Sequence, residues 1–278
     1  MGQDMNFGNN LHDCLYKYET HLHTSQGSAC SGTSAECQVR ALKALGYRGA
    51  FITDHFFNGN TAVDRRLPWD IRVHLFCQGY EDAKRVGDEI GFQVFFGLEF
   101  GYHASEFLVY GVDKEFLLNH PEIEKMTPWE LCELVHSAGG FLVQAHPFRE
   151  ASYIKDIKLY PNCVDGVEVT NTSHRNPKYD ERALWYAKSY NLPQTGGSDT
   201  HYAQWQSGGG VAVEKPFETP NDYYQALIDN KLRVLERCEI SPESFDIGIE
   251  LYHKGPDISL LPPDLKAKAE EFYKNIQE

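Results

Sequence analysis

The sequence lacks the cysteine patterns of disulfide-bonded frameworks and of thiolate zinc sites. Its seven cysteines are an odd number, and no two of them form a C-x-x-C pair. A disulfide framework usually contains an even number of cysteines, and zinc sites built from thiolates usually contain close cysteine pairs. We therefore expect reduced and mostly buried thiols.

Long apolar runs are also missing. No apolar stretch approaches the ~18 residues that cross a membrane. The first residues, Met1-Gly2-Gln3-Asp4, have neither the basic nor the apolar region of a signal peptide. These features predict a cytoplasmic protein that does not associate with a membrane.

Basic residues are scarce compared with acidic ones. The chain has 26 Lys and Arg against 40 Asp and Glu, which gives a formal net charge of −14. Stable binding of duplex nucleic acid needs clustered Lys and Arg, so we do not expect it. A small anionic substrate stays compatible with this charge if bound metal ions make the site locally positive. The sequence gives no indication of the oligomeric state.

Short apolar runs alternate with helix-like segments along most of the 278 residues, and 41% of the residues are hydrophobic. Such alternation predicts an α/β fold with a parallel sheet, and the number of repeats favours a closed barrel. Strands are expected near 14–21, 50–53, 92–96, 107–111, 141–145, 164–169, 192–195 and 211–213. Helices are expected near 33–46, 68–90, 127–136, 151–159, 177–190, 219–230 and 265–276.

A His-x-His motif ends the first expected strand. Alternate residues of a strand point to the same face, so His21 and His23 can present two imidazoles to one point. In β/α barrels the functional groups project from the C-terminal ends of the strands, so motifs at those ends converge. Four further motifs follow expected strands: Thr53-Asp54-His55, Gly97-Leu98-Glu99, Ala145-His146-Pro147 and Gly197-Ser198-Asp199-Thr200-His201.

With these five motifs in this order, the chain resembles the PHP (polymerase and histidinol phosphatase) family of metal-dependent phosphoesterases over roughly residues 14–235. The resemblance implies a distorted seven-stranded, TIM-like β/α barrel with a centre of two or three metal ions at the C-terminal strand ends. It also implies a barrel domain at 1–236. Residues 237–278 would then be an extension whose terminal helix packs on the barrel.

The resemblance also implies the ligands of two metal ions. His21 and His23 would hold the first ion together with Glu99 and Asp199. Glu99 would bridge to a second ion, which His146 also binds. Histidines and carboxylates in this mixture suit zinc, iron or manganese better than magnesium or calcium.

A third ion would be held by His55 and His201, and here the chain departs from the family. Many relatives carry an Asp or His seven or eight residues after the first motif histidine, where this chain has Ser28, Ala29 and Cys30. We therefore expect two firmly held metal ions and a third held weakly. Cys30 could also be taken for a nucleophile, but a metal centre explains the surrounding histidines better.

Glu106 occupies a position where many relatives carry a second-metal histidine, so it is either a carboxylate ligand or an ordinary loop acid. Asp54 neighbours His55 on a strand and faces the opposite side, which favours a structural role. Arg149 could bind a phosphate in bidentate fashion. His174 could contact the substrate or protonate a leaving group.

These residues predict a metal-dependent phosphoric ester hydrolase, acting on a small phosphorylated compound or a short nucleotide. Glu99, Asp199 and His201 are its expected catalytic residues. One alternative is an amidohydrolase, because those barrels also begin with His-x-His. The bridging Glu99 argues against it, since amidohydrolases commonly bridge their metals with a lysine. The other alternative is a metal-binding module without turnover.

Overall fold

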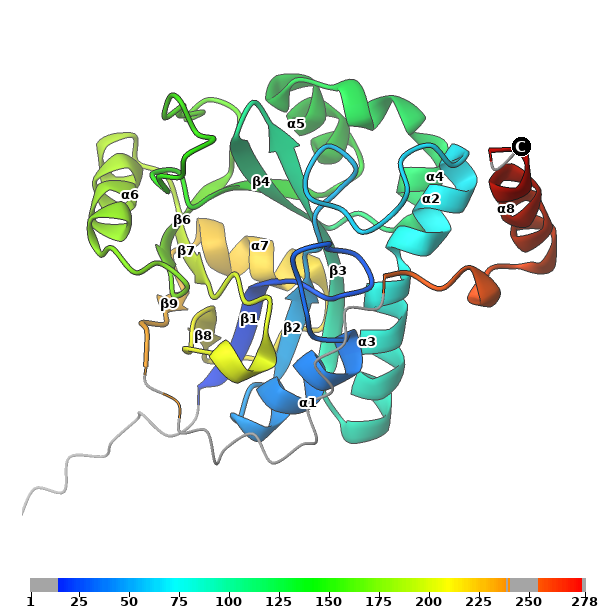
Figure 1. Cartoon of the computed structure of the whole chain (residues 1–278). Helices are drawn as coiled ribbons and strands as arrows, with labels where there is room; N and C mark the ends of the chain where they lie inside the picture. The colour runs from blue at the N-terminus through cyan, green and yellow to red at the C-terminus, as the bar shows by residue number, and fades with distance from the viewer. Residues whose placement is uncertain (1–14, 239, 241–254, 277–278) are drawn as a thin grey trace, which may run out of the picture.

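The computed structural model describes residues 15–238, 240 and 255–276. One mixed sheet of nine strands, in the order β7-β6-β5-β4-β3-β2-β1-β8-β9, curves into a nearly closed barrel (Figure 1). Helices α1 (Ala35–Ala44), α3 (Gln78–Ile90) and α6 (Lys178–Ser189) lie on its outside. In chain order the strands are β1 (Tyr16–Leu22), β2 (Gly49–Ile52), β3 (Gln93–Tyr102), β4 (Ser105–Tyr110), β5 (Phe141–Ala145), β6 (Gly166–Asn171), β7 (Gln194–Gly197), β8 (Val211–Val213) and β9 (Arg233–Val234).

The barrel closes where the second half of β1 meets the segment after β7. The His23 amide donates to the Thr200 carbonyl at 3.1 Å, and the Asp199 amide donates to the His21 carbonyl at 2.9 Å. The first half of β1 instead pairs with β8 in antiparallel fashion. The two ends of the barrel domain therefore meet along one strand, and both carry motif residues.

The expected α/β barrel is confirmed, but the expected count of seven strands and the all-parallel sheet are wrong. The sheet has nine strands, and β4 runs antiparallel to both β3 and β5. The turn from β3 to β4 consists of His103 and Ala104, both with positive φ (47° and 65°). Asn and Gly normally mark such two-residue turns. Because the turn contains neither Asn nor Gly, the hairpin could not be recognised from the sequence. The expected strand therefore ended at Phe96, six residues before the observed end of β3 at Tyr102.

The expected helices are found at their positions with two exceptions, and one further helix, at Lys114–Asn119, was not expected. The expected helix 68–90 is two helices, broken at Cys77. The expected helix at 151–159 is irregular chain, because Tyr153 (59% exposed) and Ile157 (40% exposed) give it no buried apolar face. The α-helices are α1 (Ala35–Ala44), α2 (Trp69–Phe76), α3 (Gln78–Ile90), α4 (Lys114–Asn119), α5 (Pro128–Ser137), α6 (Lys178–Ser189), α7 (Pro220–Ile228) and α8 (Pro263–Asn275).

Two apolar layers support the site. Inside the barrel, Phe51, Tyr110, Phe141 and Tyr223 form a buried aromatic layer, with Tyr223 supplied by α7. The hydroxyl of Tyr110 donates to the carbonyl of Thr20 at 2.7 Å, which ties this layer to the strand that carries the His-x-His motif. The floor beneath the polar residues is therefore made of buried aromatic rings.

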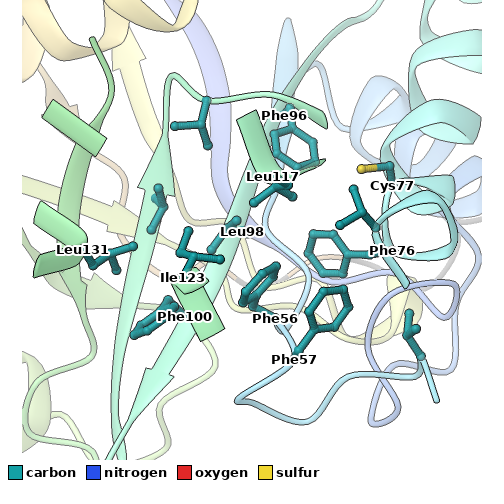
Figure 2. Packing of buried hydrophobic residues seen from close by; sticks show 14 of the residues in the cluster. Phe56, Phe57, Phe76, Cys77, Phe96, Leu98, Phe100, Leu117, Ile123 and Leu131 are labelled. Carbon is teal, nitrogen blue, oxygen red and sulfur yellow. The ribbon is translucent and has the colours of Figure 1, made fainter. Parts of the chain in front are cut away.

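A second cluster lies on the outer face of β3, beneath the helices that follow it (Figure 2). Leu98 and Phe100 of β3 contribute to it, together with the consecutive aromatic pair Phe56 and Phe57. Helix α8 adds the buried side chains of Leu265 and Ala269 to the same cluster and packs beside α2. Residues 241–254 of the expected extension lie outside the described residues. No helix among the described residues is long and apolar enough to cross a membrane.

Candidate metal centre

The motif histidines and carboxylates converge at one end of the barrel. His23, His55, His146 and Asp199 follow β1, β2, β5 and β7, while His21 lies within β1. All five residues are at least 94% buried, as is Glu99. The expectation that every motif ends a strand fails for Glu99, which lies inside β3 because this strand continues into the hairpin.

Glu99 occupies the middle of the cluster. Its Oε1 lies 3.3 Å from His21 Nε2 and 3.2 Å from His146 Nε2, and its Oε2 lies 2.6 Å from His55 Nδ1. Burial alone would raise the pKa of Glu99, but the charges of His55 and His21 hold it well below its usual range. The carboxylate is therefore ionised and in contact with three imidazoles from three different strands.

Asp199 closes the cluster from the opposite side. Its Oδ1 lies 3.2 Å from His23 Nε2 and 3.6 Å from His21 Nε2. Its backbone has a positive φ of 53°, a conformation that few residues other than glycine adopt. The side chain of Asn171 donates to Oδ2 at 3.3 Å. The turn after β7 thus aims the carboxylate at both histidines of the first motif.

Glu168 fixes the ring of His21. The Nδ1 of His21 donates to Glu168 Oε1 at 2.9 Å, so Nε2 faces the centre and carries the lone pair when the ring is neutral. The other oxygen of Glu168 accepts from the His146 amide at 2.9 Å and from the Asn171 side chain at 3.1 Å. Glu168 lies within the strand expected at 164–169, and no feature of the sequence pointed to this role.

Ser28 fixes the ring of His23 in the same way. The hydroxyl of Ser28 donates to Asp54 at 2.7 Å and also lies 3.0 Å from His23 Nδ1. Since its single proton goes to Asp54, His23 must donate from Nδ1 and keep a lone pair on Nε2. Asp54 also accepts from the amide and hydroxyl of Thr24, both at 2.6 Å. Asp54 therefore has the structural role that its position predicted.

Glu19 anchors the backbone behind the first motif. Its Oε1 accepts from the amides of Thr20, His21 and Ser198, each at 2.9 Å. Burial raises the pKa of Glu19 to about 7, against the opposing effect of these hydrogen bonds. The carboxylate joins β1 to the turn after β7 and so fixes the spacing between the two motifs.

The cluster has the donor set and the unpaired atoms that metal ions require. His21 Nε2 and His23 Nε2 lie 3.2 Å apart, although both carry lone pairs when their Nδ1 atoms donate. His55 Nδ1 and Glu99 Oε2 are buried and lie 2.6 Å from one another, with no further hydrogen-bond partner among the described residues. A shared cation would satisfy all four atoms. Four overlapping groups of ligand-type side chains can each hold an ion: His21/His23/Glu99, His21/His146/Glu168, His55/Glu99/Glu106 and His23/His55/His201.

Glu106 and Arg149 stand together at the rim. Glu106 Oε2 lies 3.4 Å from His146 Nε2, because β4 pairs beside β5. The Arg149 guanidinium lies 3.7 Å from Glu106 and 3.5 Å from Asp199, and its side chain is 26% exposed. Burial would lower the pKa of Arg149, but Glu106 and Asp199 raise it. The arginine therefore places a permanent positive charge at the edge of the cluster.

His174 lies beside the centre but is held from behind. Its Nδ1 donates to Asp180 at 2.7 Å, and its ring centroid is 6.2 Å from that of His146. Its Nε2 is buried and has no hydrogen-bond partner within the described part of the chain. The structure thus leaves one nitrogen of His174 available to a bound molecule.

Cys30 was considered as a nucleophile from the sequence and was not favoured for that role. It is partly buried, and its thiol forms side-chain hydrogen bonds with His201 and His55. Burial would raise the pKa of Cys30, but these hydrogen bonds lower it to about 6. The thiol therefore lies next to the two histidines that the family resemblance assigns to a third ion.

Solved structures with the same fold include a two-domain protein from Bacteroides vulgatus that contains a predicted PHP-like metal-dependent phosphoesterase. The similarity has a TM-score of 0.58 at 16% identity, covering 80% of this chain and 65% of that chain. This chain has the PHP-like fold. The PHP-like barrel also resembles PsfC from Pseudomonas syringae, with a TM-score of 0.55 at 16% identity over 94% of this chain and 99% of that chain.

A third similar structure is the lesion-specific endonuclease PfuEndoQ from Pyrococcus furiosus. Its TM-score is 0.51 at 11% identity, over 82% of this chain and 60% of that one. No family model and no curated protein matches the sequence. The PHP-like fold expected from the five motifs is thus confirmed by structure, while this chain spans only about 65% of the length of the Bacteroides protein.

Proposed function

We propose that this protein is a metal-dependent phosphoesterase that hydrolyses a small phosphorylated compound or a short nucleotide. The observation that carries the proposal is the position of Glu99, an ionised carboxylate in contact with imidazoles from β1, β2 and β5. Asp199 faces the imidazoles of His21 and His23 from the other side. One carboxylate between several histidines is suited to bridge two cations.

Each proposed ion has its own set of residues. His21, His23, Glu99 and Asp199 would hold the first ion, and Glu99 and His146 the second, with Glu106 in reach of His146. Bound zinc, iron or manganese would supply positive charge for phosphate oxygens and lower the pKa of water towards ~7. Glu168 and Ser28 keep the lone pairs of His21 and His23 directed into the site.

Arg149 would bind the phosphate. Its contacts with Glu106 and Asp199 are 3.7 Å and 3.5 Å long, so they are loose ion pairs that leave guanidinium N–H groups free to donate. A guanidinium matches two phosphate oxygens in a bidentate arrangement and stabilises the charge that develops on them. The positive charge of Arg149 at the rim also favours an anionic substrate on a chain whose formal net charge is −14.

His174 would serve the leaving group. Asp180 accepts the proton on Nδ1, so the unpaired Nε2 is the nitrogen that can exchange a proton with the substrate. His201, by contrast, lies with Nδ1 3.0 Å from the Asp199 carbonyl and donates to it. Its Nε2 lone pair is then suited to a metal ion, which favours His174 over His201 as the proton donor.

A groove of about 580 Å³ beside the centre would accept the rest of the substrate. Ser173 connects the two, because its hydroxyl donates to the carbonyl of Ser198 at 2.6 Å. Arginine and tryptophan side chains suit a second anionic group and a flat ring. The groove is lined by Thr172, Ser173, Arg175, Trp205 and Arg237, among others.

The test is a steady-state survey of phosphate release and bond cleavage with protein loaded with zinc, iron or manganese. Substrates should include sugar phosphates, nucleoside monophosphates and short single-stranded oligonucleotides, since an endonuclease shares the fold. A net charge of −14 argues that duplex DNA will be a poor substrate. Hydrolysis that chelation abolishes supports the proposal; a wild type that cleaves cyclic amides but no phosphoester contradicts it.

A further inference from the structure

We propose that the groove beside the metal centre is a nucleobase subsite, in which Trp205 stacks on the base and Gln206 binds its edge. The substrates would then be nucleotides, in preference to sugar phosphates that carry no base. The inference rests on the proposed function, because it narrows the substrate class of the same centre. It also makes a separate claim about binding, which can be tested without hydrolysis.

The groove shares its edge with the turn that carries Asp199. Ser173 lines the groove, and its hydroxyl donates to the Ser198 carbonyl at 2.6 Å and lies 3.2 Å from the Asp199 carbonyl. Trp205 lines the same groove and follows His201 after four residues. The groove volume of about 580 Å³ is typical of small-molecule sites. A nucleotide whose phosphate lies at the metal centre can therefore place its base in the groove.

Trp205 is exposed and yet held in place. The residue is 66% exposed, while its ring centroid lies 4.3 Å from that of Tyr202. The ring of Tyr202 lies against Gly32, where any Cβ atom would collide with it. The Trp205 amide donates to the Tyr202 carbonyl at 2.9 Å, and the Ala203 amide donates to the Thr33 hydroxyl at 3.1 Å. Single exposed tryptophans are common, but one fixed on the wall of a groove presents a face for ring stacking.

Gln206 supplies an independent indication that a polar ligand belongs in the groove. The residue lines the groove and is only 4% exposed, and neither its Oε1 nor its Nε2 has a hydrogen-bond partner among the described residues. A buried amide without partners is costly. A glutamine amide donates and accepts at neighbouring atoms, which matches the donor and acceptor pair on the edge of adenine. A base stacked on Trp205 would supply both missing partners.

The charge of the groove also suits a nucleotide. Arg175 and Arg237 line it, and neither Asp nor Glu is among the described residues that do so. The Arg237 guanidinium donates to the carbonyls of His174 at 3.2 Å and Thr172 at 3.4 Å, which holds it beside the groove. Guanidinium N–H groups can donate to acceptor atoms of a base and to phosphate oxygens. On a chain with a formal net charge of −14, the groove therefore favours an anion that carries a flat polar ring.

Adenosine 5′-monophosphate and ribose 5-phosphate isolate the subsite, because they differ only by the base. The kcat/KM of the wild type should favour the nucleotide, and Trp205→Ala should reduce this preference about 5- to 150-fold through the loss of stacking. Trp205→Phe should keep most of the preference, since it keeps a ring. Trp185→Ala is the matched control, at a tryptophan of α6 that is 60% exposed. An unchanged preference in Trp205→Ala, or its absence in the wild type, would overturn the proposal.

Adenosine tests binding without turnover, because it contains no phosphoester. Titration of the metal-loaded wild type with adenosine should quench tryptophan fluorescence, whereas ribose should not. Trp205→Phe should lose this quenching, and Trp185→Phe should retain it. Gln206→Leu should weaken adenosine binding about fivefold or more, because the hydrogen bonds to the base are lost. Quenching that persists in Trp205→Phe would contradict the assignment.

The two measurements also separate this inference from the proposed function. Quenching by adenosine at Trp205 in a protein that cleaves no phosphoester would reject the proposed function and leave the subsite intact. Hydrolysis of ribose 5-phosphate and the nucleotide at equal kcat/KM would support the proposed function and reject the subsite.

Discussion

The two faces of β3 are built for opposite purposes. Leu98 and Phe100 point outward into the apolar cluster of Figure 2 and are fully buried among aliphatic and aromatic neighbours. Glu99, between them, points into the barrel, where its two oxygens contact the imidazoles of His21, His55 and His146. Side chains alternate along a strand, so one segment serves both. The outward face contributes stability, whereas the inward face places a carboxylate among ligand-type side chains.

Phe100→Ala should give the largest loss of stability without changing the metal centre. Removing a buried phenylalanine side chain costs about 3–5 kcal/mol, and Phe100 has no exposed surface. Denaturant unfolding with metal content measured in parallel is the check. Trp185→Ala, at a side chain that is 60% exposed, should change stability by about 0.5 kcal/mol or less. A Phe100→Ala protein that folds but loses its metals would show that the two faces are not separable.

Glu99→Gln should instead lower activity, with little effect on the packing of the outward face of β3. We expect kcat/KM to fall about 100- to 1000-fold, because the bridging charge between two ions is lost. Glu106→Gln should cost about tenfold or less, since Glu106 lies at the rim and reaches the cluster through His146. Turnover and metal content should be measured for both variants. Equal losses would mean that the bridge has been assigned to the wrong carboxylate.

Arg149→Ala should produce an intermediate loss of activity with the metals retained. Removal of a charge-assisted hydrogen bond costs ~1.5–3 kcal/mol, which predicts a fall in kcat/KM of about 10- to 150-fold. The fall should appear mainly as a higher KM. Arg182 on α6 pairs with Glu150 at the surface, so Arg182→Ala provides a matched control. Loss of metals in Arg149→Ala would refute its role on the phosphate.

The smallest effect is expected at the start of α7 (Pro220–Ile228). Asp222 accepts from the Thr219 amide at 2.7 Å and from the Glu218 amide at 2.9 Å. Burial opposes these hydrogen bonds, yet they lower the pKa of Asp222 below its ordinary value of 3.8. The ionised carboxylate therefore stabilises the fold above that value, and the stabilisation is lost as the pH falls through the lowered pKa.

Asp222→Asn lacks this ionisation at every pH. Wild type should exceed it in unfolding free energy by less than about 1 kcal/mol at neutral pH, and the difference should shrink in acid. Denaturant unfolding at several pH values measures it. A difference that grows in acid would mean that the ionised carboxylate is not the stabilising form. Asp222 could then not serve as the reference for charge effects that do not involve the metals.

The sequence could predict what depends on local periodicity. His21 and His23 alternate with the packed Leu22, and the other motifs follow apolar runs, so their convergence followed from the geometry of strands and barrels. The extension of β3 could not be predicted, because its turn uses His103 and Ala104 in a conformation that their residue types do not favour.

The supporting contacts could not be predicted for a different reason. Glu168 orients His21 across a separation of 147 residues, and neither residue carries a local mark of the other. Ser28 stands where the family resemblance implies a metal ligand, yet its hydroxyl lies 3.0 Å from His23 Nδ1 and orients that ring. Such partners follow from tertiary packing, which residue spacing does not encode.

The closure of the barrel also determines when the metal centre forms during folding. His21 and His23 lie on the first strand, whereas Asp199 and His201 follow β7, and Glu19 bonds to Ser198 across 179 residues. Contacts this distant along a chain form slowly, because a long loop must be ordered before they exist. The complete set of ligands therefore forms only when β1 pairs with the segment after β7. We expect metal binding to be a late kinetic step of folding, and the bound metal to stabilise the contact between the two ends of the barrel domain.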